Sequence, residues 1–338
     1  MKEIVSQYPN KMALPFPYEI KDVTEEEDKI IKKYYKEYKR PFIRIGPHGY
    51  ILNAGYRDYA SEIYNFEVRL DDVWVTTFSR SGTTWLQELV WLVANNLDFE
   101  TARSESLTKR FSYMEYTTLT LEIRGEQESD PRAPRATHED FRSLPKLPSP
   151  RFIKSHLPLS LLPPKLLDTA KVFYIARDPR DVAVSFHFAH KLFRYFDDNV
   201  QLKEFWDLFR KDLILHTPIF PHVVEAWEKR NHPNLMFLFY EDMQNDLRSV
   251  IDKVCKFLDK EYTDEQKQQL MVYLDFNNMK KKPMTDNKKE GENEITFFRK
   301  GKSGNWVQYF DSEMTREAEE FMEKNLKLTD MRYPTVNN

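Results

Sequence analysis

The stretch from Val73 to Trp85 restricts the fold more than any other part of the chain. It reads VWVTTFSRSGTTW, so a run of β-branched and aromatic residues stops at Ser81-Gly82 and is followed at once by Thr83-Thr84. Beyond it, apolar residues recur with helical spacing at Leu86, Leu89, Val90, Val93 and Leu97. This pattern predicts a strand, a tight loop and a helix with one buried face.

The loop of this unit is a candidate phosphate site. Its amides would lie at the N-terminus of the helix, where unpaired N–H groups meet the positive end of the helix dipole. Arg80 adds a permanent positive charge, and Thr83 and Thr84 add hydroxyl donors. The loop is not a Walker A sequence, because Thr83 rather than lysine follows Gly82 and no glycine stands five positions earlier. On this stretch alone, a strand, turn and helix with a surface arginine stays open as the alternative.

Size and charge narrow the classes of protein to consider. The chain has 338 residues, 41% of them hydrophobic, which is enough for one large α/β domain or two small ones. A net charge of -3 argues against nucleic acid as a partner but leaves room for a local basic site. The single cysteine, Cys255, cannot form an intrachain disulfide and is expected to be buried in a helix. Without a signal region or a membrane span in the sequence, we expect a cytoplasmic protein with no membrane partner.

Three further apolar runs are typical of strands, at residues 151–156, 171–177 and 234–240. Helical patterns between them predict crossover connections, and so a single α/β domain with a central, mainly parallel sheet flanked by helices. The runs end in polar residues: Lys154 and His156, Arg177 and Asp178, and Tyr240 with Glu241 and Asp242. Ligands of open parallel sheets bind where the carboxyl ends of the strands meet. We therefore expect these side chains to converge with Arg80 and Ser81.

The other segments are expected to surround this sheet. Residues 1–60 should form an N-terminal wrap with a charged helix near 25–38, as part of the same domain as residues 61–338. Residues 124–150 contain five prolines and no periodicity, which predicts a long exposed loop, a kind of segment that often acts as a lid.

Towards the C-terminus the pattern becomes more helical. Helices are predicted over residues 181–193, at two places within 202–229, and over 311–325. Residues 280–294 are charged and aperiodic, which predicts a loop. The turn FRKGKSGNW at 298–306 combines cationic side chains with glycines and could bind a second phosphate.

Four blocks, in this order and spacing, resemble the cytosolic sulfotransferase family. They are TFSRSGTTW at 77–85, RFIKSHLP at 151–158, ARDPRDVAVS at 176–185 and FRKGKSGNW at 298–306. LPFPY at 14–18 and DPRDV at 178–182 are most similar to the insect branch, which includes a retinol dehydratase. The resemblance covers most of the chain, and such an ordered set is far more specific than a lone glycine loop.

The resemblance implies transfer of a sulfuryl group from 3′-phosphoadenosine 5′-phosphosulfate (PAPS) to the hydroxyl or amine of a small acceptor, leaving the product PAP. By matching positions, the 5′-phosphosulfate would be held by Arg80, Ser81, Gly82, Thr83, Thr84 and Trp85, with Trp85 beside the adenine. The 3′-phosphate would be held by Arg177, Ser185, Arg299, Lys300 and Gly301. The adenosine would be lined by Tyr240, Phe276 and Met279, and the acceptor by Lys154, His156, Phe78 and Phe186.

The residue types suit this chemistry. A neutral imidazole, with an unperturbed pKa of about 6.5, can take the proton of an attacking hydroxyl near pH 7 and makes His156 the candidate base. Cations at Arg80 and Lys154 would stabilise the charge that gathers on the departing phosphate. The donor already carries its leaving group, so no metal is demanded, and the sequence contains no convincing metal-ligand cluster.

Several positions depart from the family pattern. Arg80 stands where most members have lysine, and Ser79 stands where they have proline. An arginine is a poor proton donor, so we expect purely electrostatic assistance from Arg80. Asp275 replaces a small hydroxyl residue and Asn305 replaces an aspartate. The family's dimer motif would align with residues 307–316, where its key residues are missing, which favours a monomer or a weak dimer.

The preferred reading is an active sulfotransferase with a small hydrophobic acceptor, such as a phenol, a sterol or a retinoid alcohol. One alternative is a retinol-dehydratase-like activity, in which a transient sulfate ester loses sulfate to give an alkene. Another is a non-catalytic nucleotide- or ligand-binding protein on the same scaffold, against which Lys154 and His156 argue. A P-loop kinase would need the missing Gly-Lys-Ser/Thr signature.

Overall fold

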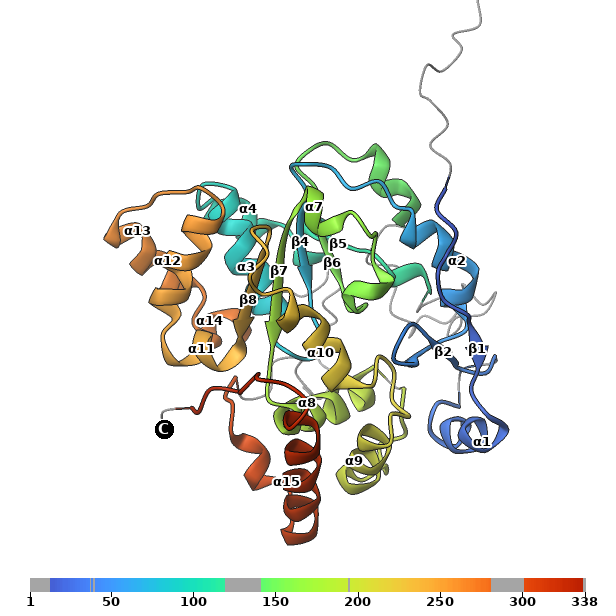
Figure 1. The fold of residues 1–338 in the computed structure, drawn as a ribbon. Helices are drawn as coiled ribbons and strands as arrows, with labels where there is room; N and C mark the ends of the chain where they lie inside the picture. Colours follow the sequence, from blue (N-terminus) through green and yellow to red (C-terminus); the bar gives the residue numbers. More distant parts are fainter. Residues whose placement is uncertain are drawn as a thin grey trace, which may run out of the picture.

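The centre of the computed structural model, which describes residues 13–36, 38, 40–118, 141–193, 195–280 and 301–336, is a five-stranded sheet (Figure 1). Its strands are β4 (Val73–Thr76), β5 (Ser112–Tyr113), β6 (Phe152–Ser155), β7 (Lys171–Ala176) and β8 (Leu235–Phe239). Their order is β5-β6-β4-β7-β8, and every neighbouring pair is parallel. The predicted α/β class with a central parallel sheet is confirmed, and each of the four predicted runs supplies one strand. The short edge strand β5 was not predicted.

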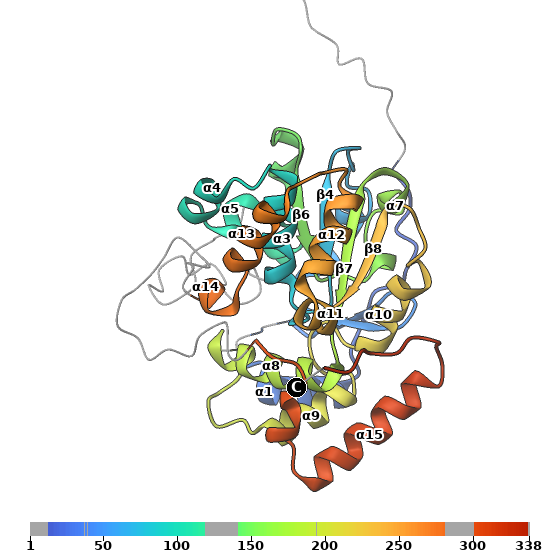
Figure 2. The same cartoon turned by 90° about the vertical axis from the view of Figure 1, so that its left-hand side faces the viewer.

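Alternate residues of these strands belong to two different hydrophobic cores, as the two-residue period of a strand requires. Val73 and Val75 pack on one face, whereas Trp74 packs on the other. The first face is covered by α3 (Thr83–Ala94), α12 (Leu247–Phe257) and α13 (Asp264–Tyr273). The opposite face is covered by α2 (Gly55–Tyr64), α8 (Pro179–Leu192), α9 (Leu202–Arg210) and α10 (Ile219–Glu228). Helices therefore flank the sheet on both sides (Figures 1 and 2).

The N-terminal residues form a small antiparallel sheet that shares the second of these cores. Its strands are β1 (Lys21–Asp22), β2 (Ile43–Ile45) and β3 (Tyr50–Leu52). The predicted charged helix is α1 (Glu25–Tyr34), which begins at a capping box between Thr24 and Glu27. Tyr35 and Tyr50 are fully buried in the same core as Trp74.

The remaining elements are mostly short segments, followed by the C-terminal helix α15. They are α4 (Phe99–Ser104), α5 (Leu107–Arg110), η1 (Phe141–Lys146), η2 (Leu159–Leu161), α7 (Leu166–Thr169), α11 (Tyr240–Asn245), α14 (Phe276–Lys280), η3 (Asn305–Gln308) and α15 (Ser312–Leu326). The predicted C-terminal helix is thus present, and its residues Met314, Ala318 and Met322 are buried. Cys255 is buried in α12.

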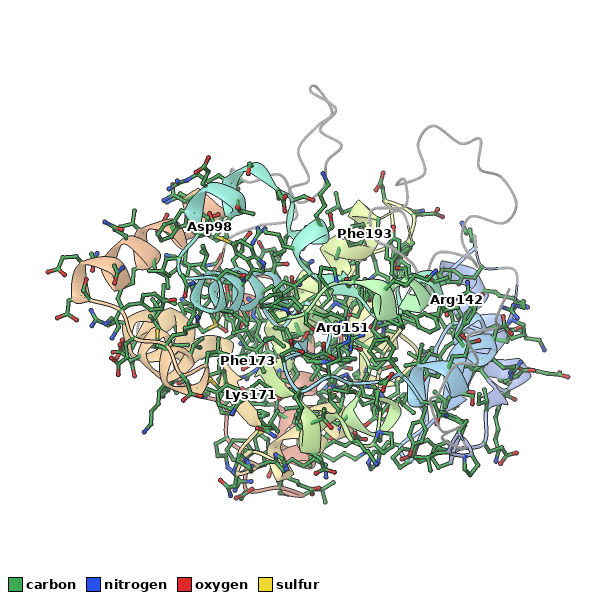
Figure 3. The ribbon with its side chains drawn as sticks, turned by 90° about the horizontal axis from the view of Figure 1, so that it is seen from above. Asp98, Arg142, Arg151, Lys171, Phe173 and Phe193 are labelled. Carbon is green, nitrogen blue, oxygen red and sulfur yellow. The ribbon has the colours of Figure 1, made fainter. Side chains whose placement is uncertain are left out.

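The prediction of an exposed loop over 124–150 is wrong for residues 141–146. Residues 141–146 form η1, in which Phe141 and Leu144 are buried. The buried guanidinium of Arg151 ties this segment to the body, because it donates to the carbonyl of Leu144 at 3.3 Å and pairs with Asp72 at 2.5 Å. Figure 3, seen from above, shows Arg151 in the middle of the molecule. Residues 124–140 and 281–294 of the predicted loops lie outside the described residues.

No helix among the described residues is long and apolar enough to cross a membrane.

Candidate active site

The loop between β4 and α3 is a tight turn. Arg80 has a φ of 69° and Gly82 a φ of 104°, so the chain passes twice through the left-handed region before the helix begins. The carbonyl of Gly82 accepts from the N–H groups of Trp85 and Leu86, both at 3.1 Å. The first N–H groups of a helix have no acceptor within it, so those of α3 are available at this loop.

Glycine is required at position 82 for a second reason. A Cβ atom there would lie 2.5 Å from Cδ2 of Tyr240, which follows β8. The loop backbone therefore lies directly against this ring. Trp85 also contacts Tyr240, with ring centres 5.5 Å apart, and its Nε1 donates to the carbonyl of Leu274 at 3.0 Å.

Two polar side chains from other elements contact Arg80 of this loop. Nε of Arg80 donates to the hydroxyl of Ser185 on α8 at 3.2 Å, and Nη1 of Arg177 donates to the carbonyl of Arg80 at 3.4 Å. Arg177 reaches this place because β7 ends just before it, where Asp178 caps α8 and Pro179 starts that helix. Its guanidinium also lies over the ring of Tyr240, 4.3 Å from the ring centre.

The segment after residue 300 reaches the same place. Nη2 of Arg177 donates to the carbonyl of Lys302 at 3.1 Å. Gly301 has a φ of 62°, and a Cβ there would lie 2.0 Å from the ring of Phe276, so backbone and ring are in contact. Met279, one helical turn after Phe276, is buried. Arg299 and Lys300 lie outside the described residues.

Two buried polar atoms at this place have no hydrogen-bond partner among the described residues, the hydroxyl of Ser81 and Nε of Arg177. Buried polar groups are normally paired, so these two atoms are available to a polar ligand. Together with the first N–H groups of α3 and the charge of Arg80, they provide donors and positive charge. This set fits a phosphorylated nucleotide such as PAPS.

Lys154 and His156 lie at the end of β6, the neighbour of β4. Nδ1 of His156 lies 3.0 Å from the carbonyl oxygen of Thr77, the first residue after β4. Nδ1 also lies 3.2 Å from the hydroxyl of Thr77, which can accept from it as well. A proton on Nδ1 satisfies the carbonyl, which can only accept, and this tautomer leaves Nε2 with its lone pair. Burial, with the charge of Lys154 as the next cause, holds the pKa of His156 well below its usual value. The imidazole is therefore neutral at pH 7.

Lys154 has an unusual environment for a cation. Its Nζ lies 4.0 Å from the centre of the Tyr113 ring on β5. Burial lowers its pKa to about 8, Glu115 opposes that shift and Arg80 adds to it. Lys154 therefore remains mostly charged at pH 7, and Arg80 is close enough to influence it.

Phe78 and Phe186, which the resemblance assigns to the acceptor, are packed edge to face with ring centres 6.1 Å apart. Phe78 is fully buried, and its ring also contacts Phe209 and His222. Both rings are thus part of the core behind the loop. Thr84 lies in the first turn of α3, and the hydroxyl of Thr83 is paired with Thr77 at 2.7 Å.

Sequence reasoning missed three features of this site. Glu115, a buried carboxylate, accepts from the backbone N–H of His156 at 2.5 Å. His216 has a φ of 74°, its Nδ1 lies 2.9 Å from the hydroxyl of Ser79, and its buried Nε2 has no partner among the described residues. No periodicity or motif marks either residue.

The third feature is a pair of buried acids that hold the C-terminal turn. The hydroxyl of Ser303 donates to Asp181 at 3.0 Å and to Glu241 at 2.6 Å. Asp181 also accepts from the backbone N–H groups of Gly304 and Trp306. Asp181 lies in one of the blocks that carry the resemblance and Glu241 follows a predicted strand, but only the fold shows what they bind.

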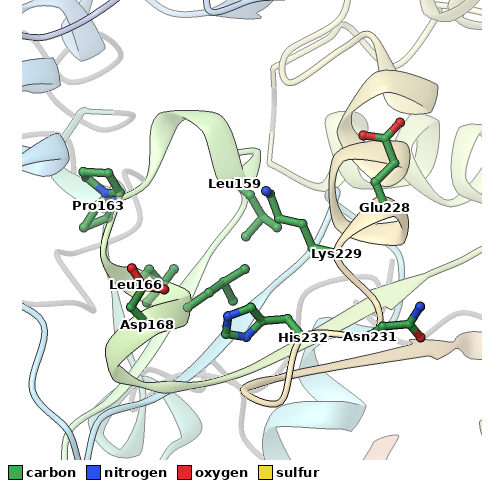
Figure 4. A pocket seen from close by; sticks show the side chains of 10 residues that line it. Leu159, Pro163, Leu166, Asp168, Glu228, Lys229, Asn231 and His232 are labelled. Carbon is green, nitrogen blue, oxygen red and sulfur yellow. The ribbon is translucent and has the colours of Figure 1, made fainter.

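A pocket of about 390 Å³ lies elsewhere, near the start of β7 and β8 (Figure 4). Pro163, Asp168, Lys229 and His232 are among its lining residues. None of the predicted site residues lines it. The described residues also contain no group of three or more His, Cys, Asp or Glu side chains that could hold a metal ion.

Comparison with known proteins identifies the family to which the chain belongs. The family model described as "Sulfotransferase domain" matches residues 70–330. The chain is 32% identical to luciferin sulfotransferase of Photinus pyralis over 318 residues, which covers 89% of this chain and 85% of that protein. It is 31% identical to sulfotransferase 1 family member D1 of Rattus norvegicus over 279 residues, covering 81% of this chain and 89% of that protein.

Solved structures are also similar to this chain over nearly its whole length. The crystal structure of retinol dehydratase with retinol and PAP is 39% identical and superposes with a TM-score of 0.85, over 95% of this chain and 100% of the other. A structure of retinol dehydratase with androsterone and PAP matches equally well, over 95% and 99% of the two chains. The chain therefore belongs to the sulfotransferase family, as an insect-type, PAPS-dependent sulfotransferase.

Proposed function

We propose that this sulfotransferase acts on the hydroxyl of a small hydrophobic alcohol or phenol, and that His156 is the general base. The observation that carries the proposal is the hydrogen bond from Nδ1 of His156 to the carbonyl of Thr77. It leaves Nε2 as a proton acceptor, on a side chain that burial keeps neutral at pH 7.

PAPS, when bound, supplies the sulfuryl group and a phosphate leaving group. His156 takes the acceptor's proton on Nε2 as the acceptor oxygen bonds to sulfur and the bond from sulfur to the phosphate oxygen breaks. Arg80 and Lys154 stabilise the negative charge that the phosphate oxygen gains.

The other predicted residues have binding roles in this proposal. The loop from Arg80 to Trp85 binds the 5′-phosphosulfate, and Arg177, Ser185 and Gly301 bind the 3′-phosphate. Trp85, Tyr240 and Phe276 hold the adenosine. Support comes from the unpaired hydroxyl of Ser81 and the unpaired Nε of Arg177, which are the kinds of donors that phosphates need.

The substitution His156→Asn tests the base. The amide nitrogen of asparagine reproduces the donor at Nδ1, so the bond to Thr77 can be kept while the proton acceptor is removed. We expect turnover to fall by about 10² to 10⁴, the usual contribution of a general base, whereas PAP binding measured by calorimetry stays at the parent value. Turnover equal to the parent's would contradict the proposal.

A second candidate activity comes from the similarity to retinol dehydratase, at 39% identity over 95% of this chain. In this reading the sulfate ester is transient and loses sulfate to leave an alkene. Incubation with PAPS and retinol, followed by mass spectrometry of the products, separates the two. A stable ester supports simple sulfation, and an anhydro product supports dehydration.

A further inference from the structure

The residue His156 has its backbone held on both sides by side chains, which is unusual for a position just beyond a strand. Its N–H donates to Oε1 of Glu115 at 2.5 Å, and its carbonyl accepts from Nε2 of His222 at 3.0 Å. With the ring bonded to Thr77, three separate contacts fix this residue. Such supporting contacts are what keep a reacting side chain in one geometry.

Glu115 makes the larger part of this framework. Its second oxygen, Oε2, accepts from the hydroxyl of Ser155 at 2.8 Å. It therefore holds the side chain of one residue and the backbone of the next, at the end of β6. The residue is only 1% exposed, so its carboxylate is not stabilised by bulk water.

Glu115 also lies near a cation, Lys154. The pairing of β5 with β6 brings Lys154 beside Glu115, because Tyr113 lies opposite Lys154 and the N–H of Met114 donates to the carbonyl of Lys154 at 3.0 Å. The two charges attract, since each favours the ionised form of the other. Other groups facing the pair are Arg80 from the loop after β4, His156 itself, Tyr113 from β5 and Tyr56 from α2. Of these groups, Arg80 is a cation that repels Lys154, which leaves Glu115 as the counter-charge.

We propose that Glu115 is a positioning residue with two tasks: it fixes the peptide of His156, and it is the counter-charge that keeps Lys154 protonated. The inference rests on the proposed roles of His156 and Lys154. Glu115 touches neither the donor nor the acceptor in this scheme, and acts only through those two residues.

The pH dependence of the proposal follows from its two charges. Burial raises the pKa of Glu115 to about 7, and burial lowers that of Lys154 to about 8. Below pH 7, Glu115 is protonated in the parent and its charge is lost, so the parent resembles a Glu115→Gln variant. Above pH 7, Glu115 is ionised in the parent and favours the charged form of Lys154. The Glu115→Gln variant lacks this charge.

The test compares kcat/KM for PAPS between pH 6 and pH 9 in the parent and in Glu115→Gln. We expect the ratio of parent to variant to be smallest at pH 6 and to rise with pH, by about tenfold for each unit that the pKa of Lys154 falls. The control is His222→Gln, which removes the imidazole that contacts the carbonyl of His156 but leaves the charge near Lys154. The ratio of parent to His222→Gln should be constant between pH 6 and pH 9. A constant ratio for Glu115→Gln would overturn the counter-charge role.

A second measurement needs no variant of Glu115 and no reaction. In the parent, with lysines labelled by ¹³C-methylation and Lys154 identified by its loss in Lys154→Arg, the Lys154 resonance should titrate in two steps, near pH 7 and near pH 8. A single step would overturn the inference. Because neither PAPS nor an acceptor is present, this result is independent of whether His156 is the base.

Discussion

Arg80 is the residue at which this chain departs most from the usual chemistry of its family. It adopts a φ of 69°, bonds Ser185 through Nε and gives its carbonyl to Arg177. A guanidinium stays charged at any physiological pH, so it can stabilise a leaving phosphate but does not readily give it a proton. Purely electrostatic assistance by Arg80 therefore stays a prediction.

The substitution Arg80→Ala should lower kcat by about 10² to 10³, as does the loss of other donors aimed at developing charge. Arg80→Lys should recover much of the loss, because it keeps the charge although it gives up the bond from Nε to Ser185. Single-turnover kinetics with labelled PAPS measures both. An alanine variant as fast as the parent would show that Arg80 plays no part in the chemical step.

A different kind of residue effect is expected at Gly82. Alanine there must adopt a φ of 104° and place its Cβ 2.5 Å from Tyr240. We expect a loss of stability of about 1 to 3 kcal/mol and a PAP affinity at least about tenfold weaker, measured by thermal unfolding and calorimetry. Gly49→Ala is the matched control, since its φ is 65° and its nearest neighbour is 3.9 Å away. If both variants bind PAP like the parent, the loop does not need its close approach to Tyr240.

At the level of elements, each strand end contributes one part of the site. β4 leads into the loop, β6 carries Lys154, Arg177 follows the end of β7, and Tyr240 follows the end of β8. Their parallel register, such as Val75 opposite Lys154 and Phe173, brings these ends to one edge of the sheet. The site is therefore a direct product of the strand register.

Two acids hold the last element of the site, the turn from Gly301 to Trp306. Asp181 on α8 and Glu241 on α11 both accept from Ser303. Burial raises the pKa of Glu241 to about 7, above the 4.5 of an ordinary glutamate. The folded state therefore binds this proton more tightly than the unfolded state between those two pH values. The contribution of Glu241 to stability accordingly falls as the pH rises from about 4.5 to 7.

The substitution Glu241→Gln should remove that dependence. Glutamine keeps an oxygen for Ser303 and carries no charge, so the variant should gain stability relative to the parent on going from pH 5 to pH 8. The gain is up to about 3 kcal/mol by linkage. Denaturant unfolding at both pH values measures it, with the exposed Glu228→Gln as control. A difference between variant and parent that is the same at both pH values would contradict this reasoning.

For the molecule as a whole, local patterns in the sequence predicted the sheet and most of the helices. The four apolar runs and the helical spacing after Thr84 depend on neighbouring residues, and the structure contains all four strands and the helix α3. The predicted helix is too long at its end, because α3 stops at Ala94 and Leu97 has a φ of 59°. The strand β5 was missed because two residues carry no pattern, and only pairing with β6 defines them. Glu115 was missed for the same reason, since its bond to His156 joins residues 41 apart in the sequence. The cytoplasmic location and the monomeric or weakly dimeric state stay predictions.

The strand order has a consequence for the direction of the reaction. β4 is the middle strand, with β6 on one flank and β7 and β8 on the other. In our assignment the nucleophile arrives over β6, and the nucleotide departs over β7 and β8. An in-line displacement needs just such an opposed entry and exit. New acceptors can therefore evolve through changes on the β6 flank, without changes to the residues that bind the nucleotide.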